Sequence, residues 1–133
     1  MEKVLIIEDD KFLKDLLIKQ LGDIGYTVFH AVDCEGGFKI TKDEKPDIIL
    51  LDLILPGLSG FDFLKEIKKD SSESKDIPVL ILSNLGQEDD IKKGIELGAE
   101  DFLIKAHFVI PEIIEKIKKT LAQKNGNYKA SAG

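Results

Sequence analysis

Short apolar runs alternate with helical patterns five times along this chain of 133 residues, and that alternation constrains the fold more than any other feature. The runs are rich in Val, Ile and Leu, which is typical of strands that are buried on both faces. We predict strands at Lys3–Ile7, Tyr26–Ala31, Ile48–Leu51, Val79–Leu82 and Asp101–Ile104. Strict alternation of strand and helix indicates an α/β protein in which helices cover both faces of a five-stranded parallel sheet.

The helical pattern is weakest between the second and third strands. We expect a helix from Asp33 to about Lys42, although Gly36 and Gly37 inside it each cost helix stability of about 1 kcal/mol. Asp33 is a suitable N-terminal cap for this helix, because its carboxylate can accept a bond from an unpaired backbone amide.

Capping residues also support the helices that follow the third and fourth strands. Ser59 and Asp62 form a capping-box pair for one, and Asn84 with Gln87 offers the same arrangement for the other. Gly98 stands where a helix end favours a left-handed residue.

Composition and charge exclude several classes of protein. The chain is 43% hydrophobic and 33% charged, which is ordinary for a globular protein of one domain. Its net charge of −6 argues against direct nucleic-acid binding, because a phosphate backbone requires a basic footprint. Residues 125–133 are small and polar without a core pattern, and we expect them to form a disordered tail.

The single cysteine, Cys34, cannot form an internal disulfide, which fits a reducing compartment. No apolar run reaches membrane-spanning length, and no signal-peptide pattern precedes the first strand. We therefore expect a cytoplasmic protein with no membrane partner, in which Cys34 begins a helix rather than serving as a reactive thiol.

Three carboxylates stand where predicted strands end. Glu8 and Asp9 follow the first strand, and Asp52 follows the third. Ligands of open α/β sheets bind beyond the carboxyl ends of the strands, so these side chains are expected to share one cavity. Like charges in one cavity repel, and a divalent cation removes that penalty. Oxygen ligands suit Mg²⁺, so the pattern predicts a Mg²⁺ site for phosphoryl chemistry.

These residues belong to a longer series that resembles the receiver domain of two-component response regulators, including the chemotaxis regulators, over about residues 2 to 123. The series, in chain order, is Glu8, Asp9, Asp52, Pro56, Gly60, Ser83 and Lys105. The resemblance implies a doubly wound, flavodoxin-like sheet of strand order 2-1-3-4-5, with a receiver domain at residues 1–124. It also implies a protein that catalyses only its own phosphorylation and dephosphorylation, and so is not an enzyme in the usual sense.

Carried over to this chain, the resemblance makes Asp52 the phosphoacceptor. Its carboxylate would attack the phosphorus of a phosphohistidine, carried by a sensor histidine kinase or a phosphotransfer protein, or of a small phosphodonor. The resemblance implies Mg²⁺ as the cofactor, bound by Glu8, Asp9, Asp52 and the backbone carbonyl of Ile54.

The same resemblance assigns the phosphoryl oxygens to Ser83 and Lys105. Movement of Ser83 toward the phosphoryl group would let Phe102 turn inward as the switch residue. The surface of the fourth helix, fifth strand and fifth helix would then change, and a downstream protein or a second copy of the chain would bind it. Phe102 has no hydroxyl, so packing alone would carry the switch.

Three positions depart from the family pattern. Ala106 follows Lys105 where a cis proline is usual, and we expect a trans bond because a non-proline cis bond costs about 2.5–4 kcal/mol. Asn84 replaces a small residue after Ser83 and either crowds the phosphodonor or caps a helix. Ile54 and Leu85 stand at positions that tune hydrolysis, and apolar side chains there cannot orient water, so we expect slow hydrolysis.

Simpler explanations remain open at several positions. Asp10 is expected to cap the first helix rather than to bind metal. Phe102 is as compatible with an ordinary core role as with a switch. Ser83 can simply close a strand, and Lys105 can be a solvated lysine. We expect His107 to be a surface residue, because nothing in the sequence supplies it with a catalytic partner.

Three other functions are alternatives to a phosphorylated receiver domain. A flavodoxin requires a hydroxyl- and glycine-rich phosphate loop after the first strand, where this chain has three carboxylates. A haloacid-dehalogenase-like phosphatase usually carries its nucleophile after the first strand, whereas Asp52 follows the third. The remaining alternative is a pseudo-receiver that acts as a scaffold without phosphorylation, and Ala106 and Asn84 keep it open.

Overall fold

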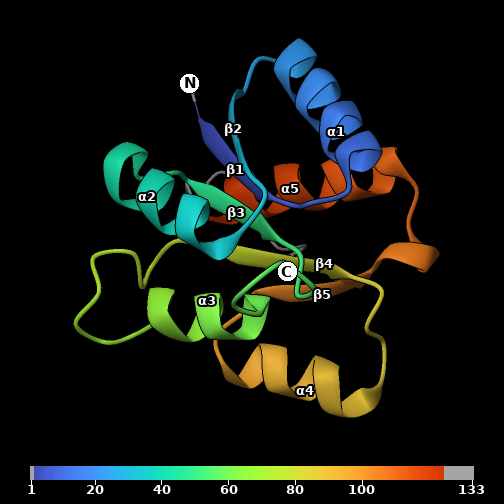
Figure 1. Cartoon of the computed structure of the whole chain (residues 1–133). Coiled ribbons are helices and arrows are strands. Elements are labelled where there is room, and N and C mark those ends of the chain that lie inside the picture. The colour runs from blue at the N-terminus through green and yellow to red at the C-terminus, as the bar shows by residue number, and fades with distance from the viewer. Residues whose placement is uncertain (1, 125–133) are drawn as a thin grey trace.

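A computed structural model describes residues 2–124, and its five parallel strands form one sheet in the order β2-β1-β3-β4-β5 (Figure 1). The strands are β1 (Lys3–Ile7), β2 (Thr27–Ala31), β3 (Ile48–Leu51), β4 (Val79–Ser83) and β5 (Asp101–Ile104). The predicted α/β class, parallel sheet and strand order are confirmed. Only two strand ends differ from the prediction, since β2 begins one residue later and β4 extends to Ser83. The tail expected at residues 125–133 lies outside the described residues.

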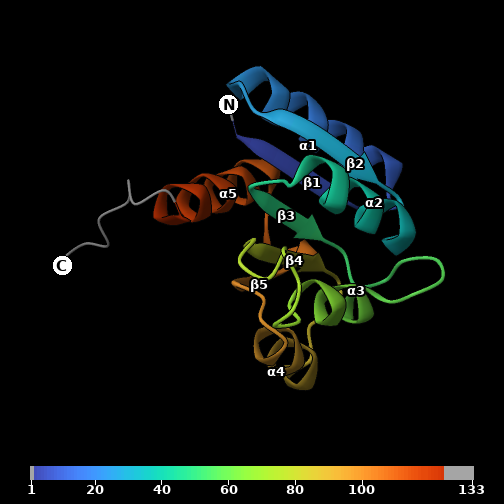
Figure 2. The same ribbon diagram turned by 90° about the vertical axis from the view of Figure 1, so that its left-hand side faces the viewer.

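Helices cover both faces of the sheet, as Figures 1 and 2 show. Their bounds are α1 (Lys11–Ile24), α2 (Cys34–Glu44), α3 (Gly60–Ile67), α4 (Glu88–Glu96) and α5 (Ile110–Lys124), with a short 3₁₀ turn η1 (Lys105–His107) before α5. Helices α1 and α5 pack on one face, and α2, α3 and α4 pack on the other.

The central strands supply both halves of the core. In β1, the side chains of Val4 and Ile6 join the cluster under α1 and α5, whereas Leu5 and Ile7 join the cluster under α2 and α3. All four are fully buried. The near-continuous apolar runs of the sequence therefore arise because each central strand faces a helix layer on both sides.

Helix α2 is longer than its weak sequence pattern indicated, running from Cys34 to Glu44 with Asp33 as its cap. A β-carbon at Gly37 would lie only 2.6 Å from Cδ1 of Ile7. The glycine that weakens this helix locally is therefore what allows it to lie close against β1. Burial raises the pKa of the Cys34 thiol to about 11, consistent with an unreactive residue that begins this helix.

The predicted caps are confirmed except in one case. Ser59 and Asp62 form the capping box of α3. The expected Asn84–Gln87 pair is wrong, because α4 begins at Glu88 and its N-cap, Gln87, makes no side-chain cap bond. The loop after β4 is longer than predicted, so Asn84 precedes the cap by three residues and is exposed.

Two further helix ends agree with the sequence. Asp10 caps α1 by accepting a bond from the amide of Leu13 at 3.2 Å, so the simpler explanation for Asp10 is correct. Gly98, just past α4, has a φ of +109°. Among the described residues, no helix is long and apolar enough to cross a membrane.

Candidate functional site

Three carboxylates meet at the carboxyl edge of the sheet, as predicted. Glu8 and Asp52 directly follow β1 and β3, which pair in register up to Ile7 and Leu51. One oxygen from each of Glu8, Asp9 and Asp52 lies within 4.8 Å of the other two. Glu8 is 2% exposed and Asp52 5% exposed, whereas Asp9 is on the surface.

Backbone bonds hold the two buried carboxylates in place beyond the strand ends. The amide of Asp52 donates to the carbonyl of Ile7 at 3.0 Å, and the amide of Glu8 donates to the carbonyl of Ala31 at 3.0 Å. The sheet ladder thus continues for one residue into the site, and both acidic residues inherit the rigidity of the central strands.

Lys105 reaches this pair from the end of β5. Its Nζ lies 2.7 Å from Oε1 of Glu8 and donates to Oδ2 of Asp52 at 3.0 Å. Its side chain is 17% exposed, so the solvated-lysine explanation is wrong for this residue. Burial alone lowers the pKa of the Lys105 ammonium, but its bonds to the two carboxylates outweigh burial and raise it.

Glu8 is the most perturbed acid of the site. Burial first, and then the close approach of the Asp52 carboxylate, raise the pKa of Glu8 to about 7 despite the opposing effect of Lys105. Oε2 accepts a bond from the amide of Asp10 at 3.2 Å. Oε1 has no hydrogen bond of good geometry, because its contact with Lys105 satisfies the distance of an ion pair only.

These features fit a hard divalent cation. Oε1 of Glu8 meets the Lys105 ammonium as an ion pair outside good hydrogen-bond geometry, and a metal ion would give this buried oxygen a further partner. The side-chain atoms available as metal ligands are all carboxylate oxygens, the type that Mg²⁺ prefers. One of the three carboxylates is open to solvent.

The other predicted site residues lie nearby. Ser83 is fully buried at the end of β4, and its hydroxyl accepts a bond from the amide of Leu85 at 3.3 Å. The amide of Ile54 donates to Oδ1 of Asp52 at 3.2 Å, while the Ile54 side chain is 56% exposed. Leu85 is half-buried against the core.

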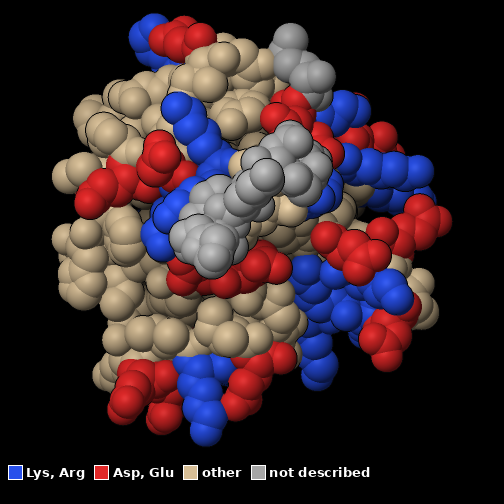
Figure 3. Space-filling view, turned by 180° about the vertical axis from the view of Figure 1, so that it is seen from behind, with Lys and Arg blue, Asp and Glu red and all other residues tan. Residues whose placement is uncertain are grey.

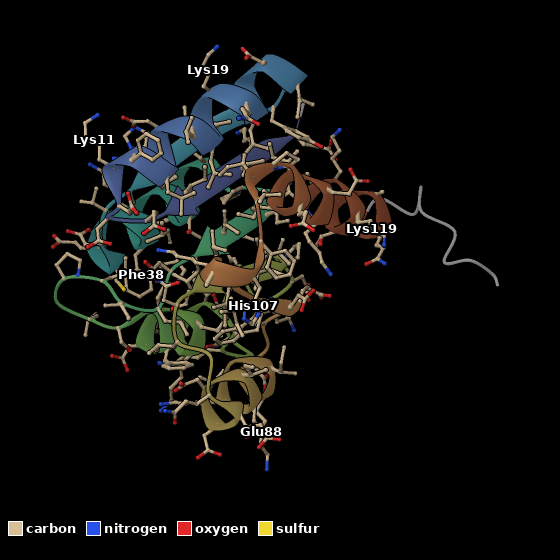
Figure 4. The ribbon with its side chains drawn as sticks, turned by 90° about the vertical axis from the view of Figure 1, so that its right-hand side faces the viewer. Lys11, Lys19, Phe38, Glu88, His107 and Lys119 are labelled. Atoms are coloured by element: carbon tan, nitrogen blue, oxygen red, sulfur yellow. The ribbon has the colours of Figure 1, made fainter. Side chains whose placement is uncertain are left out.

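The segment after Lys105 departs from the family pattern in the expected way. No cis peptide bond occurs among residues 2–124, so the bond before Ala106 is trans. Residues 105–107 form the turn η1 instead, and Lys105 still reaches Asp52. His107 is exposed in this turn, in agreement with the expected surface role (Figure 4).

Phe102 lies under α4 rather than on the surface. It is 9% exposed and belongs to the core cluster on the α2–α3–α4 face of the sheet. A β-carbon at Gly94 of α4 would lie 3.1 Å from its ring. This position fits an ordinary core residue in the described conformation and leaves the switch role as a prediction.

Gly60 belongs to the series that resembles receiver domains, but its physical role is evident only in the structure. A β-carbon there would lie 2.3 Å from the carbonyl oxygen of Asp52, and its amide donates to the carbonyl of Leu53 at 2.9 Å. Helix α3 therefore begins directly on the backbone of Asp52. A glycine immediately after the capping Ser59 was the only local signal for this contact.

Comparison with known proteins gives one family. Residues 4–118 match the response regulator receiver domain. Among curated proteins, the DNA-binding dual master transcriptional regulator RpaA of Synechocystis is 38% identical over 121 residues, which are 91% of this chain and 49% of that protein. The phosphate regulon transcriptional regulatory protein PhoB of Escherichia coli is 34% identical over 119 residues, 90% of this chain and 51% of PhoB. The chain thus spans about half the length of these relatives.

Solved structures agree with the family match. The non-phosphorylated HemR receiver domain from Leptospira biflexa superposes with a TM-score of 0.83 at 29% identity. The alignment covers 92% of this chain and 95% of that domain.

Proposed function

The chain belongs to the response regulator receiver domain family of two-component systems, and we propose on that basis that Asp52 is its phosphoacceptor. The observation that carries the proposal is the convergence of Asp52, Glu8, Asp9 and Lys105 at one edge of the sheet. Three carboxylates that can hold a cation and one ammonium lie there on rigid strand ends, and the positive charge of the ammonium and of a bound cation would stabilise a phosphoryl group.

The reaction would begin with attack by a carboxylate oxygen of Asp52 on the phosphorus of a phosphohistidine. The new P–O bond forms as the P–N bond breaks, and the histidine ring leaves and takes up a proton. Oδ1 is held by the amide of Ile54 and Oδ2 by Lys105, so the nucleophile is already oriented. Orientation removes part of the entropic cost of the step.

A Mg²⁺ ion would be held by Glu8, Asp9, Asp52 and, as the resemblance implies, by the backbone carbonyl of Ile54. When bound, Mg²⁺ supplies positive charge to the phosphoryl oxygens. Asp9 is exposed to solvent, whereas Glu8 and Asp52 are buried.

Lys105 and Ser83 would bind the phosphoryl oxygens after transfer. Lys105 already contacts Asp52, so it needs only to follow the added group. The Ser83 hydroxyl currently accepts a bond from Leu85 and has its own proton to donate. Its movement would free space for Phe102 and alter the surface formed by α4, β5 and α5, which a downstream protein or a second copy of the chain would bind.

Exposed apolar side chains near the carboxyl edge support a protein phosphodonor. Phe12 and Val109, which lie beside the starts of α1 and α5, are 75% and 61% exposed. Leu58, in the loop before α3, is 54% exposed. Such side chains suit a histidine kinase or phosphotransfer protein that presents a phosphohistidine to Asp52.

The described surface gives no support to direct nucleic-acid binding by this segment. Basic and acidic side chains lie interspersed on the face seen in Figure 3, and the net charge of the chain is −6. The relative named as DNA-binding, RpaA, is about twice as long as this chain. We propose one receiver domain at residues 1–124 that acts in the cytoplasm, catalyses its own phosphorylation and dephosphorylation, and turns over no second substrate.

Hydrolysis of the phosphoryl group is expected to be slow. Ile54 and Leu85 flank the site with apolar side chains, neither of which can position a water molecule for attack. Hydrolysis within seconds in a purified sample would contradict this part of the proposal.

The deciding experiment is intact-mass measurement after incubation with Mg²⁺ and acetyl phosphate. We expect the mass gain of one phosphoryl group, absent in Asp52→Ala and in the presence of a chelator. A gain that persists in Asp52→Ala would assign the acceptor elsewhere. Absence of any gain, together with absence of Mg²⁺ binding, would favour the scaffold alternative, for which the trans bond before Ala106 and the exposed Asn84 are the supporting features.

A further inference from the structure

Helix α4 is held on the sheet by few contacts. Of its nine residues, all within the described part of the chain, only Gly94 is buried. Its first turn carries three acidic residues, Glu88, Asp89 and Asp90, and Glu88 lies at the outer end of the helix in Figure 4. No side-chain bond caps this end. Apart from Gly94, Ile91 is the residue of this helix that packs, half-buried, against the core, so packing and capping contribute little to the stability of α4.

The one buried residue lies directly over the predicted switch residue. A β-carbon at Gly94 would lie 2.7 Å from Cδ1 of Ile81 and 3.1 Å from Cδ2 of Phe102. The missing side chain therefore lets the backbone of α4 approach the ring of Phe102. Any movement of that ring changes the surface on which α4 rests.

A second contact joins α4 to its neighbour α3, and the two helices lie next to each other in Figures 1 and 2. Nζ of Lys93 lies 4.4 Å from the centre of the Phe61 ring, which is the geometry of a cation–π interaction. Phe61 is itself packed against the core through α3, so it offers a fixed point. Lys93 and Gly94 are adjacent, so the two contacts hold the same turn of α4.

We propose that Phe61 and Lys93 form a latch between α3 and α4, which holds α4 over Phe102 in the unphosphorylated protein. Loss of the Phe102 contact would then release α4 only if the latch also opens. The latch therefore opposes the change of surface that follows phosphorylation. This consequence rests on the proposed function, whereas the latch itself is a property of the unmodified protein.

The first test is hydrogen exchange of α4 amides in the absence of Mg²⁺ and phosphodonor. Lys93→Met removes the charge while keeping an apolar side chain, and Phe61→Leu removes the ring while keeping apolar bulk. We expect exchange in α4 to rise about two- to fivefold in each, as expected for loss of a partly exposed cation–π contact. Amides of α1 and α5 should be unchanged.

Lys92→Met is the matched control, because Lys92 precedes Lys93 and instead faces Glu96 of its own helix at 3.9 Å. It removes the same charge but no latch contact. Equal exchange of α4 in Lys92→Met and Lys93→Met would overturn the latch. The double variant Phe61→Leu, Lys93→Met gives a second check. If its α4 exchange rate rises by the full product of the two single increases, the latch is overturned, because a single contact cannot be lost twice.

The second test measures the affinity for beryllofluoride with Mg²⁺, as a stable mimic of the phosphoryl group. Because the latch stabilises only the unliganded arrangement, its removal should tighten binding by the same two- to fivefold factor. Faster exchange with unchanged affinity would overturn the coupling to the switch. If neither the wild type nor any variant binds beryllofluoride or gains a phosphoryl group, the proposed function fails. The exchange data would still show whether the latch exists.

Discussion

The ammonium of Lys105 lies closer to Glu8, at 2.7 Å, than to the proposed phosphoacceptor, at 3.0 Å. One lysine thus neutralises two buried carboxylates that end different strands. Since the pKa of Glu8 is still raised to about 7, this single cation does not fully compensate for burial. The charge balance of the site therefore depends on pH and on any additional cation.

Mg²⁺ affinity should fall as the pH drops below 7. The folded protein holds a proton on Glu8 below its pKa of about 7, and a metal ion must displace that proton. Binding at pH 6 is therefore expected to be about tenfold weaker than at pH 8, from the fraction of Glu8 that is ionised. Calorimetric titration in two buffers of different ionisation enthalpy would measure both the affinity and the proton release. Equal affinities at the two pH values would contradict the raised pKa.

Glu8→Gln should change how stability depends on pH. The folded-state pKa of Glu8 exceeds its ordinary value of 4.5, so the folded state binds the extra proton and wild-type stability declines as pH rises from about 4.5 to 7. This decline, up to about 3 kcal/mol if the whole shift acts, should be largely absent in Glu8→Gln. Urea unfolding at pH 5 and pH 8 without Mg²⁺ tests this. A parallel decline in both proteins would locate the effect in another group.

Lys105→Met should destabilise the metal-free protein. The substitution leaves Glu8 and Asp52 buried without their shared cation, and removal of one partner from a buried pair typically costs about 3–5 kcal/mol. Partial exposure of Lys105 reduces that figure, so we expect a loss of about 2 kcal/mol at pH 8. Lys116→Met is the control, because it removes a similar charge from an exposed pair with Asp101. Equal losses in both variants would refute the structural role of Lys105.

Gly60→Ala should disturb the site through the backbone. The added β-carbon would lie 2.3 Å from the carbonyl oxygen of Asp52, so α3 or the strand end must move. We expect about 1–3 kcal/mol of destabilisation, as for other overpacked positions, and slower labelling by acetyl phosphate. Gly22→Ala provides the comparison, since nothing lies within 4 Å of a β-carbon there. Gly22→Ala should leave the rate of labelling unchanged. If Gly60→Ala also left this rate unchanged, Gly60 would have no role in positioning Asp52.

Phe12→Ala should slow phosphoryl transfer from a protein donor without affecting transfer from a small-molecule donor. Phe12 is 75% exposed on the first turn of α1, so its removal should cost little stability. Transfer from a histidine kinase that phosphorylates the wild type should slow about fivefold or more, a typical effect for an interface side chain. Labelling by acetyl phosphate should be unaffected. Ile24→Ala, at the far end of α1, is the control, and an equal effect of both substitutions on kinase transfer would contradict docking at Phe12.

The strands and their terminal carboxylates could be predicted from local sequence because each depends on a short window of residues. Buried strands appear as compact apolar runs, and three of the five were predicted with their observed bounds, including Lys3–Ile7 and Ile48–Leu51. Chain connectivity then places Glu8 and Asp52 at the same edge of any parallel sheet. The Mg²⁺ site was predicted from this pattern of carboxylates, whereas the phosphoacceptor role of Asp52 came from the family resemblance, and both remain proposals.

Helix positions were less predictable where packing outweighed propensity. Gly37 weakened the predicted pattern of α2, yet its lack of a side chain is what lets that helix lie on Ile7. Asn84 looked like a cap for α4, but the loop after β4 runs on to Gln87 before the helix begins. For α2, the deciding contact comes from a residue distant in the chain.

The α/β class, the strand positions and the three acidic residues at strand ends can be read from the amino-acid sequence, because these follow from periodicity and from which residues end each run. Three contacts appear only in the folded chain. Lys105 pairs with Glu8 as well as Asp52, α3 begins on the Asp52 backbone at Gly60, and Lys93 reaches Phe61. The physical reason is that ion pairs, close backbone approaches and ring contacts depend on distances between segments far apart in the chain, to which no local pattern is sensitive.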